Sequence, residues 1–204
     1  MQDRLNIPPT KSSLLDLKRR LEFLNEGYRL LERKRELLTR LVYEKLAEYR
    51  TLNETARESM KRAYRWLAVT QMRMGSKRIQ QLAIGMPEAF EARVLPRRNM
   101  SVQYPSVQIR QLPLLPVGIL GTDASLDETR ASFSEMVVKA AQLAEAETAL
   151  WRLLEEQRKT QKRVNALRYN VIPRFERTIS YVEATLEEEE RNTLFQLKVL
   201  AQRG

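Results

Sequence analysis

Nearly all side chains that could do chemistry in this sequence are charged. The 204 residues include 36 Lys or Arg and 26 Asp or Glu, but no Cys and no His. Without these two residue types there is no plausible nucleophile–base pair and no thiolate or imidazole metal site. The glycine-rich loop ending in Lys and Ser or Thr, which cradles phosphate groups, is also missing. We therefore expect no catalytic residue, no metal and no cofactor, and charge recognition becomes the expected chemistry of the chain.

Charge is distributed in blocks. The net charge is +10, which is typical of proteins that bind nucleic acid, acidic membrane surfaces or acidic proteins. Residues 11–40 carry a net +4, residues 152–181 a net +5, and residues 183–191 a net −4. The candidate partner-binding residues are Lys18, Arg19, Arg20, Arg33, Lys34, Arg35, Lys162, Arg163, Asn165 and Arg168. For any one basic residue among them, the alternative to partner binding is that the side chain belongs to a solvated surface without a partner.

Two long helices are expected to position these residues. In the first, alternating three- and four-residue steps define seventeen seam positions, of which thirteen are apolar, sustained over about eight heptads. In the second helix, the apolar residues form a less regular stripe. The first seam is Leu14, Leu17, Leu21, Leu24, Tyr28, Leu31, Arg35, Leu38, Val42, Lys45, Tyr49, Leu52, Ala56, Ser59, Ala63, Trp66 and Thr70. The second stripe is Phe133, Met136, Ala140, Leu143, Leu150, Leu154, Val164, Val171, Phe175, Val182, Leu186, Leu197 and Leu200.

Neither helix can bury its stripe alone, so the two are expected to pair. We predict a mainly α protein, a long antiparallel two-helix left-handed coiled coil with a small middle excursion containing a short helix and a β-hairpin. The expected segments are an N-terminal lead (1–10), a coiled-coil helix (11–73), a middle region (74–124) and a second coiled-coil helix (125–204).

The middle region collects helix breakers, among them Gly118 and Gly121. Alternation around Val102 and Tyr104 indicates a strand, which Pro105 demotes to an edge or a bulge. Its apolar face is too small for a core and is expected to pack on the coiled coil or on a partner. No apolar run approaches the roughly 20 residues of a membrane helix, and no signal peptide opens the chain. We expect a soluble, cytoplasmic protein without direct membrane insertion.

The stretch QKRVNALRYNVIP, residues 161–173, contains two unexpected residues for a helix of this kind. Pro173 lacks a backbone donor and crowds the carbonyl of Tyr169, so it predicts a helix kink. Such a kink would help the two coiled-coil helices stay wrapped around each other. Asn165 beside Val164 is expected to help fix the register of the pair. Val164, Leu167 and Val171 would then face the first helix. The alternative is a solvent-facing Asn165 and a merely tolerated proline.

The same residues carry a family resemblance. KRVNALRYNVIP followed by LEEEERNTLFQLK resembles the C-terminal signature of the D subunit of V-type and archaeal-type (A-type) rotary ATPases, and IPPTKSSLLDLKRRLEFLNEGYRLLERKRELL resembles the N-terminal one. Both helices are covered. Lys11 stands where the family usually has arginine, and Arg168 where it usually has glutamate. The second departure reverses a charge and suggests an altered partner contact.

The resemblance implies a non-catalytic central-stalk rotor shaft, peripheral to the membrane on the cytoplasmic side. Its expected partners are the ring of catalytic and non-catalytic subunits, the small F subunit of the central stalk and the funnel-shaped subunit on the membrane rotor. The shaft would couple ATP hydrolysis or synthesis in the ring to H⁺ or Na⁺ translocation.

Two other functions share parts of this pattern. A coiled coil of another assembly, such as the stalk of an export apparatus, would have the same fold, and fold does not imply function. A nucleic-acid-binding coiled coil would suit the net charge. That function predicts one continuous basic stripe, and the acidic block at residues 183–191 argues against it. No nucleic-acid partner is therefore expected.

Overall fold

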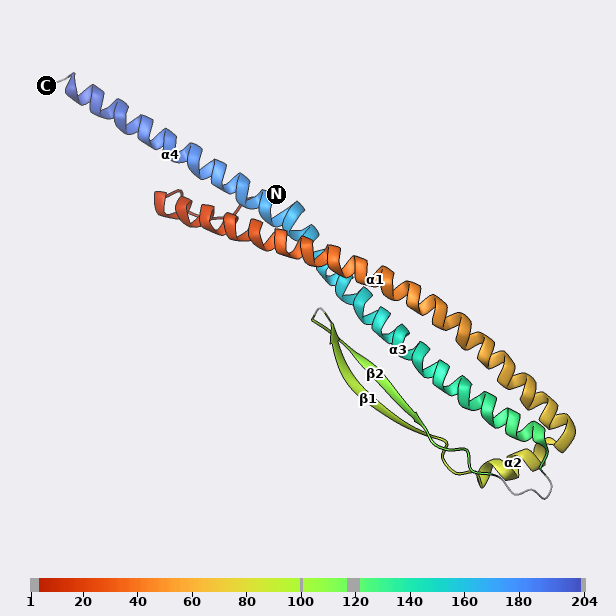
Figure 1. Cartoon of the computed structure of the whole chain (residues 1–204). Helices are drawn as coiled ribbons and strands as arrows, with labels where there is room; N and C mark the ends of the chain where they lie inside the picture. Colours follow the sequence, from red (N-terminus) through yellow and green to blue (C-terminus); the bar gives the residue numbers. More distant parts are fainter. Residues whose placement is uncertain (1–3, 100, 117–121, 203–204) are drawn as a thin grey trace. The chain divides into compact units, whose positions relative to one another are not determined.

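The computed structural model describes residues 4–99, 101–116 and 122–202. Gly118 and Gly121 lie outside these ranges. In chain order the elements are α1 (Lys11–Met74), α2 (Ser76–Ile84), β1 (Phe90–Asn99), β2 (Val102–Gln111), α3 (Ala124–Ala166), a π-helical turn η1 (Leu167–Val171) and α4 (Ile172–Ala201) (Figure 1). The prediction of a mainly α protein with two long packed helices, a short helix and a β-hairpin is confirmed.

The chain folds as two compact units, which we describe separately. Unit 1 comprises Met1–Leu37 and Gln157–Gly204, and unit 2 comprises Leu38–Glu156. In each unit a part of α1 packs against a later helix. Among the described residues, no helix is long and apolar enough to cross a membrane.

The first predicted seam matches the buried face of α1. All seventeen positions are buried or half-buried, and Leu17, Leu38 and Ala63 are among the least exposed. Heptad spacing keeps these side chains on one face of a helix that is 64 residues, or about 95 Å, long.

The second stripe is only partly right. Ala140, Leu197 and Leu200 are exposed, while alanines that the pattern passes over line the seam of α3. Ala146 and Ala149 are 5% and 2% exposed. A stripe search that weights large side chains misses such positions, because alanine contributes little to the pattern.

In unit 2, buried hydroxyl groups join α1 to α3 at the start of α3. Thr70 Oγ1 lies 2.8 Å from the carbonyl oxygen of Ser125 and 2.8 Å from Thr129 Oγ1. Arg73 Nη1 donates to Asp123 Oδ2 at 3.0 Å just beyond them. The polar seam residue Thr70 is therefore satisfied, since buried hydroxyls need a partner.

The β-hairpin of unit 2 runs beside α3 (Figure 1). Val102 packs against Leu38 and Leu153 in one buried cluster, and Tyr104 is 8% exposed. Val107 N–H donates to Glu145 Oε2 of α3 at 2.8 Å. The apolar face of the hairpin therefore packs on the helix pair, one of the two expected locations.

Two prolines face each other across the hairpin. Pro96 of β1 pairs with Pro105 of β2 in the antiparallel register. Opposite positions in such a ladder alternate between hydrogen-bonded and non-hydrogen-bonded pairs, and two residues without N–H groups fit the second kind. Val107, two residues further, belongs to the same kind, which explains why its N–H is available to Glu145.

In unit 1, the N-terminal lead folds back onto α4. Leu5 N–H donates to Thr178 Oγ1 at 3.0 Å, and the Arg4 guanidinium lies 4.4 Å from the centre of the Tyr181 ring. Leu5 and Ile7 pack against the core. That core is formed by Leu17, Ile179 and Val182, with Leu14, Leu21, Phe175 and Leu186 around it.

Candidate partner-binding surface

All ten predicted partner-binding residues lie in unit 1, and several of them bind within the chain. Lys18 Nζ lies 2.6 Å from Glu183 Oε1, and Lys11 Nζ lies 2.7 Å from Glu190 Oε1. A step of seven residues along α1 thus matches a step of seven in the opposite direction along α4, which is the pattern of an antiparallel heptad pair. The acidic block at residues 183–191 serves in part to neutralise basic residues of α1.

The outer pair gives a weak, pH-dependent contribution to stability. The hydrogen bond between the two side chains raises the pKa of Lys11 and lowers the pKa of Glu190. The contribution from Glu190 is present above its unfolded-state pKa and is lost as the pH falls through the lower folded-state pKa. The contribution from Lys11 is present below its unfolded-state pKa and is lost as the pH rises through the raised folded-state pKa.

Because the side chains of Lys11 and Glu190 are 74% and 60% exposed, solvent screens the pair. We expect Glu190→Gln to leave the melting temperature within error of the wild type at neutral pH. We also expect it to flatten the small decrease of stability on acidification. Thermal melts in acidic, neutral and alkaline buffers measure both effects. A large destabilisation at neutral pH would contradict the assignment of this pair as a screened surface contact.

A polar network crosses the seam of unit 1. Arg35 Nη1 donates to Gln161 Oε1 at 3.1 Å, and Gln161 Nε2 donates to Asn165 Oδ1 at 2.8 Å. Arg35 Nη2 also donates to Glu32 Oε1 at 2.6 Å. Asn165 is exposed at the edge of the seam and extends this network. Arg35, a polar exception in the first seam, therefore has partners on both helices.

The remaining predicted residues differ in the contacts that their side chains make within the chain. Arg20 pairs with Asp16 at 2.8 Å, and the Arg168 guanidinium lies 5.3 Å from the centre of the Tyr169 ring. Lys34 is half-buried and interacts within the chain. Four exposed residues make no hydrogen bond or ion pair with any residue of the described ranges. They are Arg19, Arg33, Lys162 and Arg163.

A π-helical turn precedes Pro173. Ile172 N–H donates to the carbonyl of Leu167, five residues back, instead of the usual four. This turn inserts one extra residue between Val164, which is 3% exposed, and the next buried apolar residue. That residue is Ile172, at 8% exposure, whereas Val171 is only half-buried. The fully buried position therefore comes one residue later than the predicted Val171, and that Val171 itself faces the first helix stays a prediction.

Sequence reasoning missed an exposed apolar line on the outer face of α1. Phe23, Leu30 and Leu37 recur every seven residues and are 74%, 71% and 38% exposed. Gly27 lies between the first two, and a Cβ built there would meet nothing within 4 Å. We call Phe23, Gly27 and Leu30 the outer ridge. A search for a second heptad stripe on the same helix would have found it.

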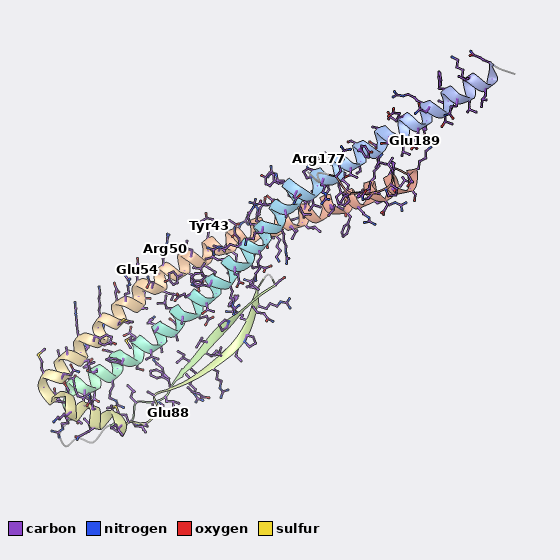
Figure 2. All side chains as sticks on the ribbon, turned by 180° about the vertical axis from the view of Figure 1, so that it is seen from behind. Tyr43, Arg50, Glu54, Glu88, Arg177 and Glu189 are labelled. Carbon is purple, nitrogen blue, oxygen red and sulfur yellow. The ribbon has the colours of Figure 1, made fainter. Side chains whose placement is uncertain are left out.

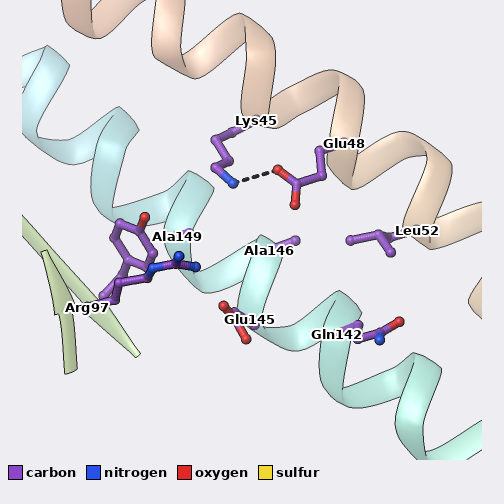
Figure 3. Close-up of a pocket in the computed structure, with 9 residues that line it drawn as sticks. Lys45, Glu48, Leu52, Arg97, Gln142, Glu145, Ala146 and Ala149 are labelled. Atoms are coloured by element: carbon purple, nitrogen blue, oxygen red, sulfur yellow. Dashed lines mark hydrogen bonds and ion pairs between the residues drawn. The ribbon is translucent and has the colours of Figure 1, made fainter. Parts of the chain in front are cut away.

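Unit 2 has a polar cleft between the hairpin and the helix pair (Figure 3). Lys45 and Glu48 of α1 pair across 2.5 Å, and Arg97 of β1 and Glu145 of α3 add one charge of each sign. The charges balance, and Glu145 already accepts the Val107 N–H. The cleft is therefore explained as the place where the hairpin is held.

The outer face of α1 in unit 2 carries exposed aromatic and charged side chains. Figure 2 shows Tyr43, Arg50 and Glu54 pointing away from α3, and Tyr43 is 69% exposed. Trp151 of α3 is 62% exposed. Tyrosine, tryptophan and arginine are enriched in protein interfaces, so exposed aromatic residues here are consistent with a protein contact.

In the described ranges, no group of three or more metal-ligating side chains is found.

Comparison with known proteins gives one consistent result. The family model that matches residues 13–202 is that of the ATP synthase D subunit. The V-type ATP synthase D subunit of Thermotoga neapolitana is 34% identical over 200 residues, 98% of each chain. The A-type ATP synthase D subunit of Pyrococcus furiosus is 33% identical over 97% of this chain and 94% of the relative. That of Methanoregula boonei is 32% identical over 98% and 97%.

Proposed function

Since the chain belongs to the ATP synthase D-subunit family, we propose that it is the central-stalk rotor shaft of a V-/A-type ATPase or ATP synthase. The similarity along nearly the whole chain carries this proposal. A member of this family is a component of an ATP synthase complex. Within it, the chain is non-catalytic and couples ATP hydrolysis or synthesis in the ring to H⁺ or Na⁺ translocation.

The structure supports a mechanical function. A shaft must resist bending and twisting, and in each unit two helices pack along a heptad seam that cross-helix ion pairs and hydrogen bonds fix in register. Both helices of each pair belong to one chain, so they turn together. The shaft contributes shape and charge, because neither a phosphate-binding loop nor a nucleophile–base pair is present in the sequence.

The proposed partners are the catalytic and non-catalytic ring subunits, the small F subunit of the stalk and the funnel-shaped subunit on the membrane rotor. Lys162 and Arg163 are exposed and unpaired within the described ranges, so they suit contacts with acidic surfaces of the ring. Electrostatic contacts of this kind fit a turning surface, since they act without interlocking. The complex would hold the chain on the cytoplasmic side of the membrane.

A reversible crosslink tests the rotor assignment. The chain has no cysteine, so Lys162→Cys supplies a unique attachment point for a cleavable bismaleimide to a cysteine introduced in a ring subunit. ATP hydrolysis by the assembled complex should fall at least about tenfold when the crosslink forms, and should recover on cleavage, because a shaft fixed to the ring cannot turn.

The matched control joins two parts of the shaft. Lys11→Cys with Glu190→Cys bridges α1 and α4 of the same chain, whose native side chains pair at 2.7 Å. This bridge should leave hydrolysis unchanged. Hydrolysis that continues with the shaft crosslinked to the ring would refute the rotor assignment. The isolated chain should neither hydrolyse ATP nor bind it tightly.

A further inference from the structure

The outer ridge of unit 1 has the geometry of a second helix-packing seam. Phe23 and Leu30 are separated by seven residues, and Leu37 continues the same line. Seven-residue spacing on a helix already wound in a heptad pair keeps side chains in one straight row. A contiguous apolar row on an exposed face marks an interaction surface, and its spacing is the one that another helix fills.

Gly27 gives independent support for an external contact. Glycine inside a helix is less favourable than alanine because its backbone loses more freedom on folding. The chain itself does not require it here, since an added Cβ would meet no atom within 4 Å and the backbone is not in the left-handed region. The remaining physical reason for a bare backbone is close approach by something outside the chain.

The charges beside the ridge specify what approaches. Arg19, Glu26 and Arg33 alternate in sign at seven-residue steps on one flank, and none has a partner within the described ranges. A second copy of the chain, packed so that Gly27 of each copy marks the point of closest approach, would place like charges opposite one another in either orientation, which is unfavourable. A complementary helix would carry an acidic, a basic and an acidic residue at the same spacing.

We propose that the outer ridge packs against a helix of another subunit of the complex, with apolar residues at heptad spacing and an acidic–basic–acidic flank. This rests on the proposed function. The partner helix lies along Phe23 and Leu30 and approaches the α1 backbone at Gly27. Its flank neutralises Arg19, Glu26 and Arg33. The order of charges reads the same in both directions, so the helix can run parallel or antiparallel to α1.

Gly27→Leu in the full chain separates this contact from folding. The isolated variant should melt about 2–4 °C higher than the wild type, because leucine favours the helix and has room. Its affinity for the remaining subunits, purified together without this chain, should fall at least about tenfold, because the added side chain blocks close approach. Ala184→Leu, at an exposed position of α4, is the matched control and should change neither affinity nor assembly.

A photoreactive phenylalanine analogue in place of Phe23 identifies the partner. The crosslinked peptide from the assembled complex should come from another subunit and carry the acidic–basic–acidic pattern at seven-residue spacing. A peptide without this pattern, or unchanged affinity of Gly27→Leu, would overturn the inference while leaving the proposed function intact. Failure of the wild-type chain to bind the remaining subunits would remove the proposed function, and this inference with it.

Discussion

Val164→Asp should lower the melting temperature of the isolated chain by roughly 10 °C, which is one of two strong effects that we expect. Val164 is 3% exposed in the seam of unit 1. A carboxylate buried there loses its hydration without gaining a partner, which costs on the order of 3–5 kcal/mol. Arg35 already donates to Glu32 and Gln161, so it is not available to neutralise the new charge.

Ala166→Asp is the matched control, because it introduces the same side chain two residues away at an exposed position. Differential scanning calorimetry of both variants gives the comparison, and the control should melt within about 2 °C of the wild type. Near-equal melting of the two variants would mean that Val164 is not enclosed by the seam. Unit 1 would then need a different packing from the one described.

Deleting Asn170 together with Pro173→Ala should preserve folding, although removing one residue normally disrupts a helix. A deletion turns everything beyond it by about 100° around the helix axis. The π-helical turn already contains one extra residue. Removing that residue converts the turn to an ordinary α-helix and keeps Ile172, Ile179 and Val182 facing α1. Pro173→Ala is needed because proline in a regular helix removes a hydrogen bond and crowds a carbonyl.

The control deletes Ser180 in the same Pro173→Ala background. Ser180 is exposed in regular α4, so its loss rotates Val182 out of the core and should lower the melting temperature by about 10 °C or more. Pro173→Ala alone should melt at or above the wild-type temperature. If the chain is the rotor shaft that we propose, each variant without the π-turn or Pro173 should also support less ion pumping by the assembled complex, because the changed helix alters the surface that the ring contacts. A comparable loss of stability in both deletions would refute the insertion model.

The sequence predicted the first helix accurately because its seam is made of large residues at unbroken heptad spacing. The two long apolar stripes, together with the glycines and prolines of the middle region, were sufficient to predict the fold class. The second helix was harder for two reasons. Ala146 and Ala149 do not stand out in a hydrophobic stripe, and the π-turn shifts the pattern by one residue at Ile172. The proline indicated that the helix is irregular there, but not that it gains a residue.

The hairpin and the partner surface were predicted less completely. Alternation in the sequence indicated a strand only around Val102 and Tyr104 of β2. β1 was not located, because most of its residues are exposed and do not alternate between apolar and polar. The candidate basic residues all lie in unit 1, and their role in partner binding stays a prediction. Sequence alone could not separate Lys18, which pairs with Glu183, from Arg19, which has no partner within the described ranges. That difference depends on which side of α1 faces α4.

The length of α1 has a consequence during synthesis. All 64 residues of α1 leave the ribosome before α3 has been synthesised. At the usual elongation rate, about 5–20 s pass between synthesis of the end of α1 and synthesis of the end of α3. Thr70 meets Ser125 across 55 residues, whereas Leu5 meets Thr178 across 173. The shorter loop costs roughly 1 kcal/mol less to close, so the helices pair first near the turn and last near the termini. Until then the nascent apolar seam is open to α1 of a neighbouring ribosome, and chaperone cover is most needed in that interval.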